Sequence, residues 1–235
     1  MSPFLGEFIG TMLLIIMGDG VVANVVLNKT KGNNGGWIVI AFGWAMAVFL
    51  GVYVSTSLGG CGHLNPAVTI AMVVFDNFDS TLLPTYILAQ FGGAITGAII
   101  VWLAYKQHFD STDDKDGKLA VFCNAPAIRG YGYNLITEIV GTFVLVFGAM
   151  AMSKPASTLG TLDALPVGLL ILGIGLSLGG PTGYAINPAR DLGPRIAHFI
   201  LPIKNKRDSD WGYSWIPVVG PIIGALIAAY LFKLI

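Results

Sequence analysis

Five stretches of the sequence contain no Asp, Glu, Lys or Arg: 32–75, 80–105, 139–153, 164–189 and 211–232. All but 139–153 are at least as long as the roughly 20 apolar residues with which an α-helix crosses a bilayer. Charged residues make up 11% of the chain, under half of the roughly 25% usual in soluble domains. A soluble globule of this length needs more charge for its surface. The sequence therefore predicts an all-α membrane protein with several spans.

Composition also excludes several classes of protein. The net charge is zero, and without a basic stripe the chain has no electrostatic footprint for nucleic acid. Its two cysteines and three histidines share no ligand spacing, so we expect neither a metal site nor a cofactor. We see no catalytic constellation, which argues against an enzyme.

Apolar runs separated by polar loops predict six membrane-spanning helices. We expect them at about 4–27, 37–58, 82–105, 133–153, 161–180 and 212–234. The segment 106–132 holds eight charged residues and is predicted to be a solvated loop. Two further apolar segments, 65–75 and 187–199, are too short to span a bilayer.

The two halves of the chain, about 1–110 and 130–235, repeat the same motifs. Glu7-Phe-Ile-Gly-Thr matches Glu138-Ile-Val-Gly-Thr, and Asn65-Pro66-Ala67 matches Asn187-Pro188-Ala189. Each half then has three spans and one short segment in the same order. Because three is odd, the halves must cross the membrane in opposite directions. Such an inverted 3+3 repeat places the functional site between the halves, near the middle of the bilayer.

The two Asn-Pro-Ala motifs predict re-entrant half-helices, since Asn is a favoured N-cap and Pro suits the first helical position. Two half-helices of opposite topology meet at their N-termini, which carry about half a positive charge each and repel cations and protons. The amides of Asn65 and Asn187 can donate hydrogen bonds to a solute hydroxyl. Backbone carbonyls ahead of them are expected to accept hydrogen bonds: Cys61, Gly62, His63, Ala185 and Ile186.

With these motifs the chain resembles the aquaporin (major intrinsic protein) family, and within it the bacterial aquaglyceroporins, or glycerol facilitators. The likeness covers nearly all of 4–234 and rests on Gly-His-Leu-Asn-Pro-Ala-Val-Thr at 62–69 and Asn-Pro-Ala-Arg-Asp-Leu-Gly-Pro at 187–194. It implies one channel domain over 1–235, passive conduction of glycerol, water and similar neutral solutes, and exclusion of ions and protons. It also implies a homotetramer in the bacterial plasma membrane, with cytoplasmic termini.

The resemblance implies a selectivity filter with three positions in the second half: Gly175, Tyr184 and Arg190. A glycine there leaves room beside an aromatic wall, which favours glycerol conduction over conduction of water alone. The fourth position falls in 37–58, where Phe42 is our choice and Ile40 and Trp44 are alternatives.

Carboxylates inside apolar helices are expensive and need partners. The resemblance makes Glu7 and Glu138 braces for the re-entrant loops. Asp191 is counted with them, and its spacing of four from Arg195 on one helix predicts a supporting ion pair. The rival reading is a proton relay, which makes the chain a proton-coupled secondary transporter. The role of Asp19 in Met-Gly-Asp-Gly stays open, either in the vestibule or in tuning permeation.

Two further questions remain open in the sequence. Other permeants of the same class are dihydroxyacetone, urea and undissociated lactic acid. Cytoplasmic termini put nine basic loop residues outside and two inside, the reverse of the positive-inside rule. We keep the family topology because almost no charge flanks the first helix.

Overall fold

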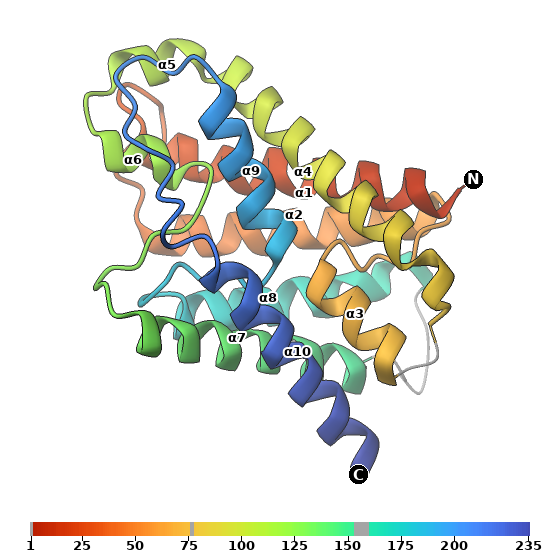
Figure 1. Cartoon of the computed structure of the whole chain (residues 1–235). Helices are drawn as coiled ribbons and strands as arrows, with labels where there is room; N and C mark the ends of the chain where they lie inside the picture. The colour runs from red at the N-terminus through yellow and green to blue at the C-terminus, as the bar shows by residue number, and fades with distance from the viewer. Residues whose placement is uncertain (1, 76–77, 153–159) are drawn as a thin grey trace.

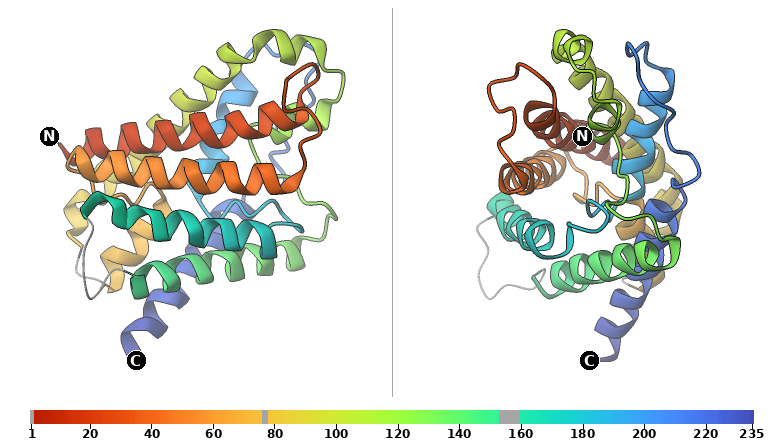
Figure 2. Two further views of the ribbon diagram at one scale, coloured as in Figure 1. Left: turned by 180° about the vertical axis from the view of Figure 1, so that it is seen from behind. Right: turned by 90° about the vertical axis from the view of Figure 1, so that its left-hand side faces the viewer.

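A computed structural model describes residues 2–75, 78–152 and 160–235, and within these ranges all regular structure is helical (Figure 1). Six long helices form the frame: α1 (Pro3–Val26), α2 (Trp37–Ser57), α4 (Leu83–Ala104), α7 (Tyr131–Met152), α8 (Ala164–Leu178) and α10 (Ile216–Leu234). In the left view of Figure 2, α1, α2, α7 and α8 run side by side in roughly the same direction. α4 and α10 cross them at an angle (Figure 1).

Two half-helices, α3 (Pro66–Phe75) and α9 (Pro188–Ile200), start near the centre of the molecule (Figure 1). α3 runs from there toward the end of the bundle at which both chain termini lie, and α9 toward the opposite end. The two short apolar segments predicted from the sequence are therefore helices that begin at mid-depth and do not cross.

The same close contact holds the frame together in both halves. A side chain on Gly93 of α4 would lie 2.3 Å from the carbonyl oxygen of Phe8 in α1, and one on Gly224 of α10 would lie 2.3 Å from that of Ile139 in α7. Small residues let helix backbones approach this closely, which is how helices pack inside membranes. Gly224 follows Gly93 by the same number of residues as Ile139 follows Phe8. The repeat found in the sequence is therefore also present in the packing of the helices.

One predicted span is shorter than expected. Within the described residues, five helices are long and apolar enough to cross a membrane, and α8 is not among them. It has 15 residues, Ala164–Leu178, where the sequence predicts 161–180. A 3₁₀ turn over Gly160–Asp163 precedes it, Pro166 lies in its first turn, and the pair Gly179-Gly180 follows its last residue. These local signals favour a helix that begins near Ala164 and ends at Leu178. Hydropathy alone does not detect these boundaries.

The expectation of a solvated loop over 106–132 is wrong. This segment contains two short helices, α5 (Lys106–Ser111) and α6 (Lys115–Ala120), and it buries Phe109, Phe122 and Cys123 completely. The Phe122 ring packs edge-on against His198 of α9, with 5.4 Å between ring centroids. Apolar residues between the charges thus dock the segment on the outer end of α9, while most of the charged side chains remain at the surface.

Candidate functional site

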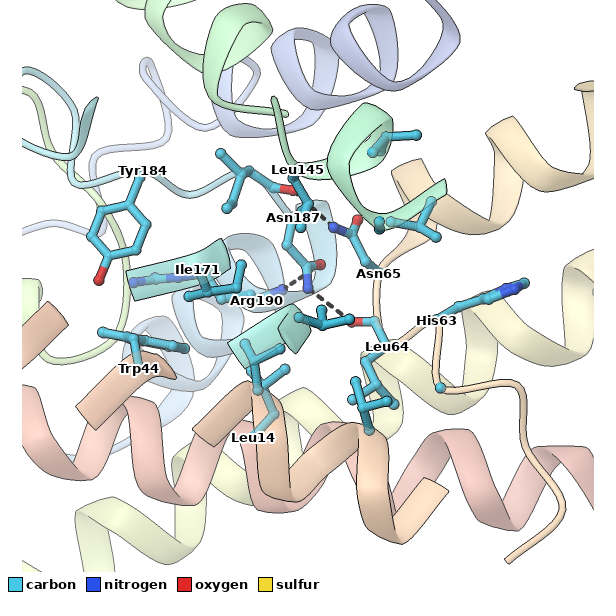
Figure 3. Close-up of a pocket in the computed structure, with 18 of the residues that line it drawn as sticks. Leu14, Trp44, His63, Leu64, Asn65, Leu145, Ile171, Tyr184, Asn187 and Arg190 are labelled. Carbon is cyan, nitrogen blue, oxygen red and sulfur yellow. Dashed lines mark hydrogen bonds between the residues drawn. The ribbon is translucent and has the colours of Figure 1, made fainter. Parts of the chain in front are cut away.

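A cavity of about 280 Å³ lies between the two halves of the chain. One side of it is apolar and is formed by residues of α1, α2, α7 and α8: Leu14, Trp44, Val48, Val52, Leu145, Val146, Val167 and Ile171. The other side is formed by the two segments that lead into α3 and α9, 61–65 and 184–187, and by Arg190. The cavity is therefore amphipathic along its length, with an apolar wall facing a polar strip (Figure 3).

Asn65 and Asn187 join the two halves at the cavity (Figure 3). Each Oδ1 accepts from the backbone N–H two residues further on, at 3.0 Å, and so caps its own half-helix. The Asn65 Nδ2 donates to the carbonyl oxygen of Ile186 at 2.8 Å, and the Asn187 Nδ2 donates to that of Leu64 at 2.8 Å. Since a carboxamide nitrogen carries two N–H groups, each keeps a second donor for the cavity.

The residues just before these asparagines have strained backbones. Leu64 and Ile186 lie in the left-handed region, with φ of 51° and 45°, and Tyr184 joins them at 42°. Non-glycine residues adopt this conformation at a cost, and such strain gathers at functional sites. The five residues proposed to offer backbone carbonyls all line the cavity: Cys61, Gly62, His63, Ala185 and Ile186.

Glu7 holds the first of these segments in place. Its carboxylate is fully buried and accepts from the backbone N–H of His63 at 2.9 Å and of Leu64 at 2.7 Å. The Gln90 amide at 2.8 Å and the Ser55 hydroxyl at 3.2 Å complete its shell. Four donors offset the cost of burying one carboxylate.

Glu138 makes the equivalent contacts in the second half. It accepts from the backbone N–H of Ala185 at 3.0 Å and of Ile186 at 2.7 Å. The hydroxyl of Thr182 donates to the same carboxylate at 2.7 Å. Each Glu thus accepts from the backbone N–H groups of the two residues that directly precede its asparagine. In this way each fixes the backbone on which the polar strip depends.

The choice of Phe42 for the filter is wrong. Its side chain is 54% exposed on the outer face of α2, whereas Trp44, one of the two alternatives, is 3% exposed and lines the cavity. Residues two apart on a helix lie about 200° apart around its axis, so only one of the two can point inward. The Arg190 guanidinium carbon lies 4.0 Å from the centroid of the Trp44 ring, a distance typical of cation–π stacking.

Gly175 has a different position from the one expected. It does not reach the cavity, because the phenol of Tyr184 fills the space beside it: an added Cβ would lie 2.8 Å from Tyr184 Cζ. The Trp37 indole donates to the Gly175 carbonyl at 2.9 Å and packs edge-on against Tyr184. The missing side chain therefore makes room for an aromatic ring, and that ring lines the cavity together with Trp44 and Arg190 (Figure 3).

Asp191 and Arg195 form a buried ion pair at 2.8 Å, with both side chains fully inaccessible. Asp191 also accepts from the backbone N–H of Asn124 at 2.7 Å. Arg195 donates further to three backbone carbonyls, those of Asn124, Ser209 and Asp210. The pair therefore ties two long outer segments to α9. The spacing of four residues predicts the ion pair. It does not predict the hydrogen bonds of the pair to the backbone of the outer segments.

His63 lines the cavity, and its ring contacts residues of α3, of the segment after α3 and of α4. Its Nδ1 lies 3.2 Å from the hydroxyl of Thr69, and its ring packs against Phe78 and Tyr86. Among the described residues, no three His, Cys, Asp or Glu side chains are placed to hold a metal ion.

Two inverted halves that place capped half-helices against one amphipathic cavity define a membrane channel. A family model described as major intrinsic protein matches residues 1–232. The chain therefore belongs to the major intrinsic protein family, as the sequence motifs predict. This membership places it among passive channels rather than enzymes.

Individual proteins in the family are similar over their whole length. A probable glycerol uptake facilitator protein of Thermotoga maritima is 58% identical over 99% of both chains. Glycerol uptake facilitator protein 3 of Lactiplantibacillus plantarum is 52% identical over 98% of this chain and 95% of its own. The solved aquaglyceroporin of Plasmodium falciparum superposes with a TM-score of 0.86 at 31% identity, over 99% of this chain and 98% of its own.

Proposed function

We propose that the chain conducts glycerol, water and similar small neutral solutes passively across a bacterial cell membrane. The observation that carries this proposal is the amphipathic cavity. Glycerol has hydroxyls along one edge and C–H groups along the other, which suits a polar strip facing an apolar wall. Both curated relatives described above are named as glycerol uptake facilitators, and this supports the assignment.

Ion exclusion follows from the charges that surround the proposed pore. The N-termini of α3 and α9 are each equivalent to about half a positive charge, and both point at the asparagine pair. Arg190 adds a full positive charge at the cavity wall. Cations and protons are repelled there, while a neutral solute exchanges its water hydrogen bonds for those of the strip.

The proposal treats 1–235 as one channel domain made of two repeat halves. Both termini lie at the same end of the bundle (Figure 1), and we assign that end to the cytoplasm in spite of the basic outer loops. The outer faces of the long helices expose large apolar side chains to lipid and to the other copies in a homotetramer: Ile38, Phe42, Leu88, Leu103, Ile136, Leu169 and Ile227.

Replacing Gly175 by alanine tests both the permeant and the filter. In proteoliposomes, we expect wild-type protein to give fast shrinkage and fast re-swelling in glycerol, unchanged by a proton ionophore. The added methyl group displaces the Tyr184 ring, since it lies within 2.9 Å of the phenol. The narrow opening between Tyr184, Trp44 and Arg190 then changes shape, and glycerol flux falls by about tenfold, an energetic change on the scale of overpacking. Stopped-flow light scattering measures both fluxes.

Gly173 of the same helix supplies the matched control, because an added Cβ there meets nothing within 4 Å. Gly173→Ala should conduct glycerol as the wild type does. Wild-type water flow without glycerol re-swelling would contradict the proposal and would direct the assay to dihydroxyacetone, urea and undissociated lactic acid. Flux that follows the proton gradient would instead support a coupled transporter.

Cys61 allows the path to be probed chemically. It is exposed and lines the cavity, whereas the second cysteine, Cys123, is fully buried. We expect a bulky thiol reagent to inhibit glycerol flux strongly in wild type and to leave a Cys61→Ser variant unaffected. Mass spectrometry locates the label. Complete labelling of Cys61 with undiminished flux would place this residue outside the conducting path.

A further inference from the structure

A second cavity, of about 260 Å³, lies next to the first one. It is formed by the end of α2, by the 3₁₀ turn before α8 and by the first turn of α8: Val52, Thr56, Gly160, Asp163, Ala164 and Val167. Val52 and Val167 also line the first cavity, so the two cavities meet at these residues. The function proposed above uses the first cavity and gives the second no role.

The lining residues of α2 show how the two cavities are arranged. They follow one another at intervals of four residues: Trp44, Val48, Val52 and Thr56. The first two line only the first cavity and the last lines only the second, whereas Val52 lines both. Residues four apart lie on one face of a helix, about 6 Å apart along its axis. The second cavity therefore follows the first along α2, toward the end of the bundle at which both chain termini lie (Figure 1).

α8 shows the same order in the opposite chain direction. Ala164 lines only the second cavity, Val167 lines both, and Ile171 lines only the first. The two helices pack closely, since a Cβ added to Gly168 of α8 would lie 2.9 Å from the carbonyl oxygen of Ala45 in α2. On both helices a valine thus marks the boundary between the two cavities.

This boundary lies where the polar strip of the first cavity begins. Gly62 of the strip packs against it, since an added Cβ would lie 2.9 Å from Val52 Cγ1 and 3.3 Å from Thr56 Cγ2. The Thr56 hydroxyl donates back into its own helix, 3.0 Å from the carbonyl oxygens of Val52 and Tyr53. A solute that passes the end of the strip therefore meets the isopropyl groups of two valines, which offer it no hydrogen bond.

We propose that the conducting path continues through the second cavity, and that Val52 and Val167 form an apolar collar that limits the flux of polar solutes. The inference rests on the proposed conduction through the first cavity. Polar solutes and water lose hydrogen bonds in an apolar constriction, which slows their passage. The collar then determines flux and specificity without binding the solute.

Replacing each valine by threonine tests the collar in proteoliposomes of the full chain. Threonine has nearly the shape of valine, and its oxygen accepts a hydrogen bond from a solute even while its proton is bonded within the helix. We expect Val52→Thr and Val167→Thr each to raise glycerol flux about fivefold, the factor that corresponds to about 1 kcal/mol for one net hydrogen bond. Stopped-flow re-swelling measures the flux per reconstituted protein. Because poor folding lowers flux, a gain separates the collar from a merely structural role.

Val54→Thr is the matched control, because Val54 lies on α2 two residues from Val52 and lines neither cavity. It should leave glycerol flux at the wild-type level. The proposal is overturned if either collar variant conducts glycerol no faster than wild type, or if Val54→Thr gives the same gain. A wild type that does not re-swell in glycerol is a separate result, which refutes the proposed function.

Thiol labelling tests separately whether solutes pass through the second cavity. In a Cys61→Ser background the other native cysteine, Cys123, is fully buried, so Val167→Cys supplies the accessible thiol. We expect a bulky thiol reagent to stop most of the glycerol flux of this variant. Leu165→Cys, at an exposed position of α8 outside both cavities, should be labelled without loss of flux. If the reagent does not label Val167→Cys, or labels it completely with undiminished flux, the path through the second cavity is refuted.

Discussion

Replacing Glu138 by glutamine is expected to lower the free energy of unfolding by about 3 kcal/mol and to remove most of the solute flux. The carboxylate accepts three hydrogen bonds, two of them from backbone N–H groups beside the polar strip. A side-chain amide offers one acceptor and presents an NH₂ to a donor, so buried N–H groups lose their partner. Ile186, whose carbonyl receives the Asn65 amide, then loses its fixed position. Denaturation in detergent and stopped-flow scattering measure the two effects.

Two companion variants give this experiment its controls. Glu7→Gln should lower stability and solute flux in the same way, because it removes the equivalent hydrogen bonds from His63 and Leu64 in the first half. Thr137→Val on the same helix as Glu138 should change little, since the exposed Thr137 hydroxyl only bonds within α7. If Glu138→Gln stays as stable as wild type yet no longer responds to a proton gradient, the carboxylate is a relay and the brace is refuted.

The second large effect is expected from Arg195→Met. Removal of the guanidinium leaves Asp191 as a buried charge without its partner, which costs about 3–5 kcal/mol. It also frees the carbonyls of Asn124, Ser209 and Asp210, so the outer segments around 121–130 and 201–215 should open. Thermal unfolding measures the loss of stability, and amide hydrogen exchange should show loss of protection confined first to these two segments.

Arg207→Met is the matched control for this variant. Arg207 also pairs with aspartates, Asp116 and Asp208, but all three side chains are partly or largely exposed. Exposed pairs contribute about 0–1 kcal/mol, so its melting temperature should remain close to that of the wild type. Equal destabilisation by both variants would contradict the prediction, because it would show that burial of the Asp191–Arg195 pair does not determine how much the pair stabilises the protein.

The half-helices could be predicted from sequence because their signals are local. An Asn-Pro pair specifies a cap and a first turn whatever surrounds it, and the repeat of the motif fixes opposite directions for the two halves. The position of Glu7 and Glu138 in apolar segments likewise predicts that hydrogen-bond donors surround their carboxylates, but it does not identify these donors. The donors themselves, such as Gln90, come from other helices and become visible only in the structure.

The rotation of α2 could not be predicted in the same way. A helix with lipid on one face and protein on the other is apolar all round, so the pattern does not distinguish Phe42 from Trp44. Gly175 shows a similar limit, since a glycine can leave space either for solute or for a neighbouring ring. The prediction for the segment 106–132 failed for a third reason. Its charged residues are typical of a solvated loop, but the apolar residues between them pack on α9.

The reciprocal hydrogen bonds of the asparagine pair also bear on how the channel is made. The amide of Asn65 needs the carbonyl of Ile186, and that of Asn187 needs the carbonyl of Leu64. A ribosome releases the first partner of each bond more than a hundred residues before the second. A nascent chain with only its first half inserted therefore has one side of the pore and no Arg190. Neither hydrogen bond can form before the second half of the chain is inserted, so the pore is completed only late in synthesis.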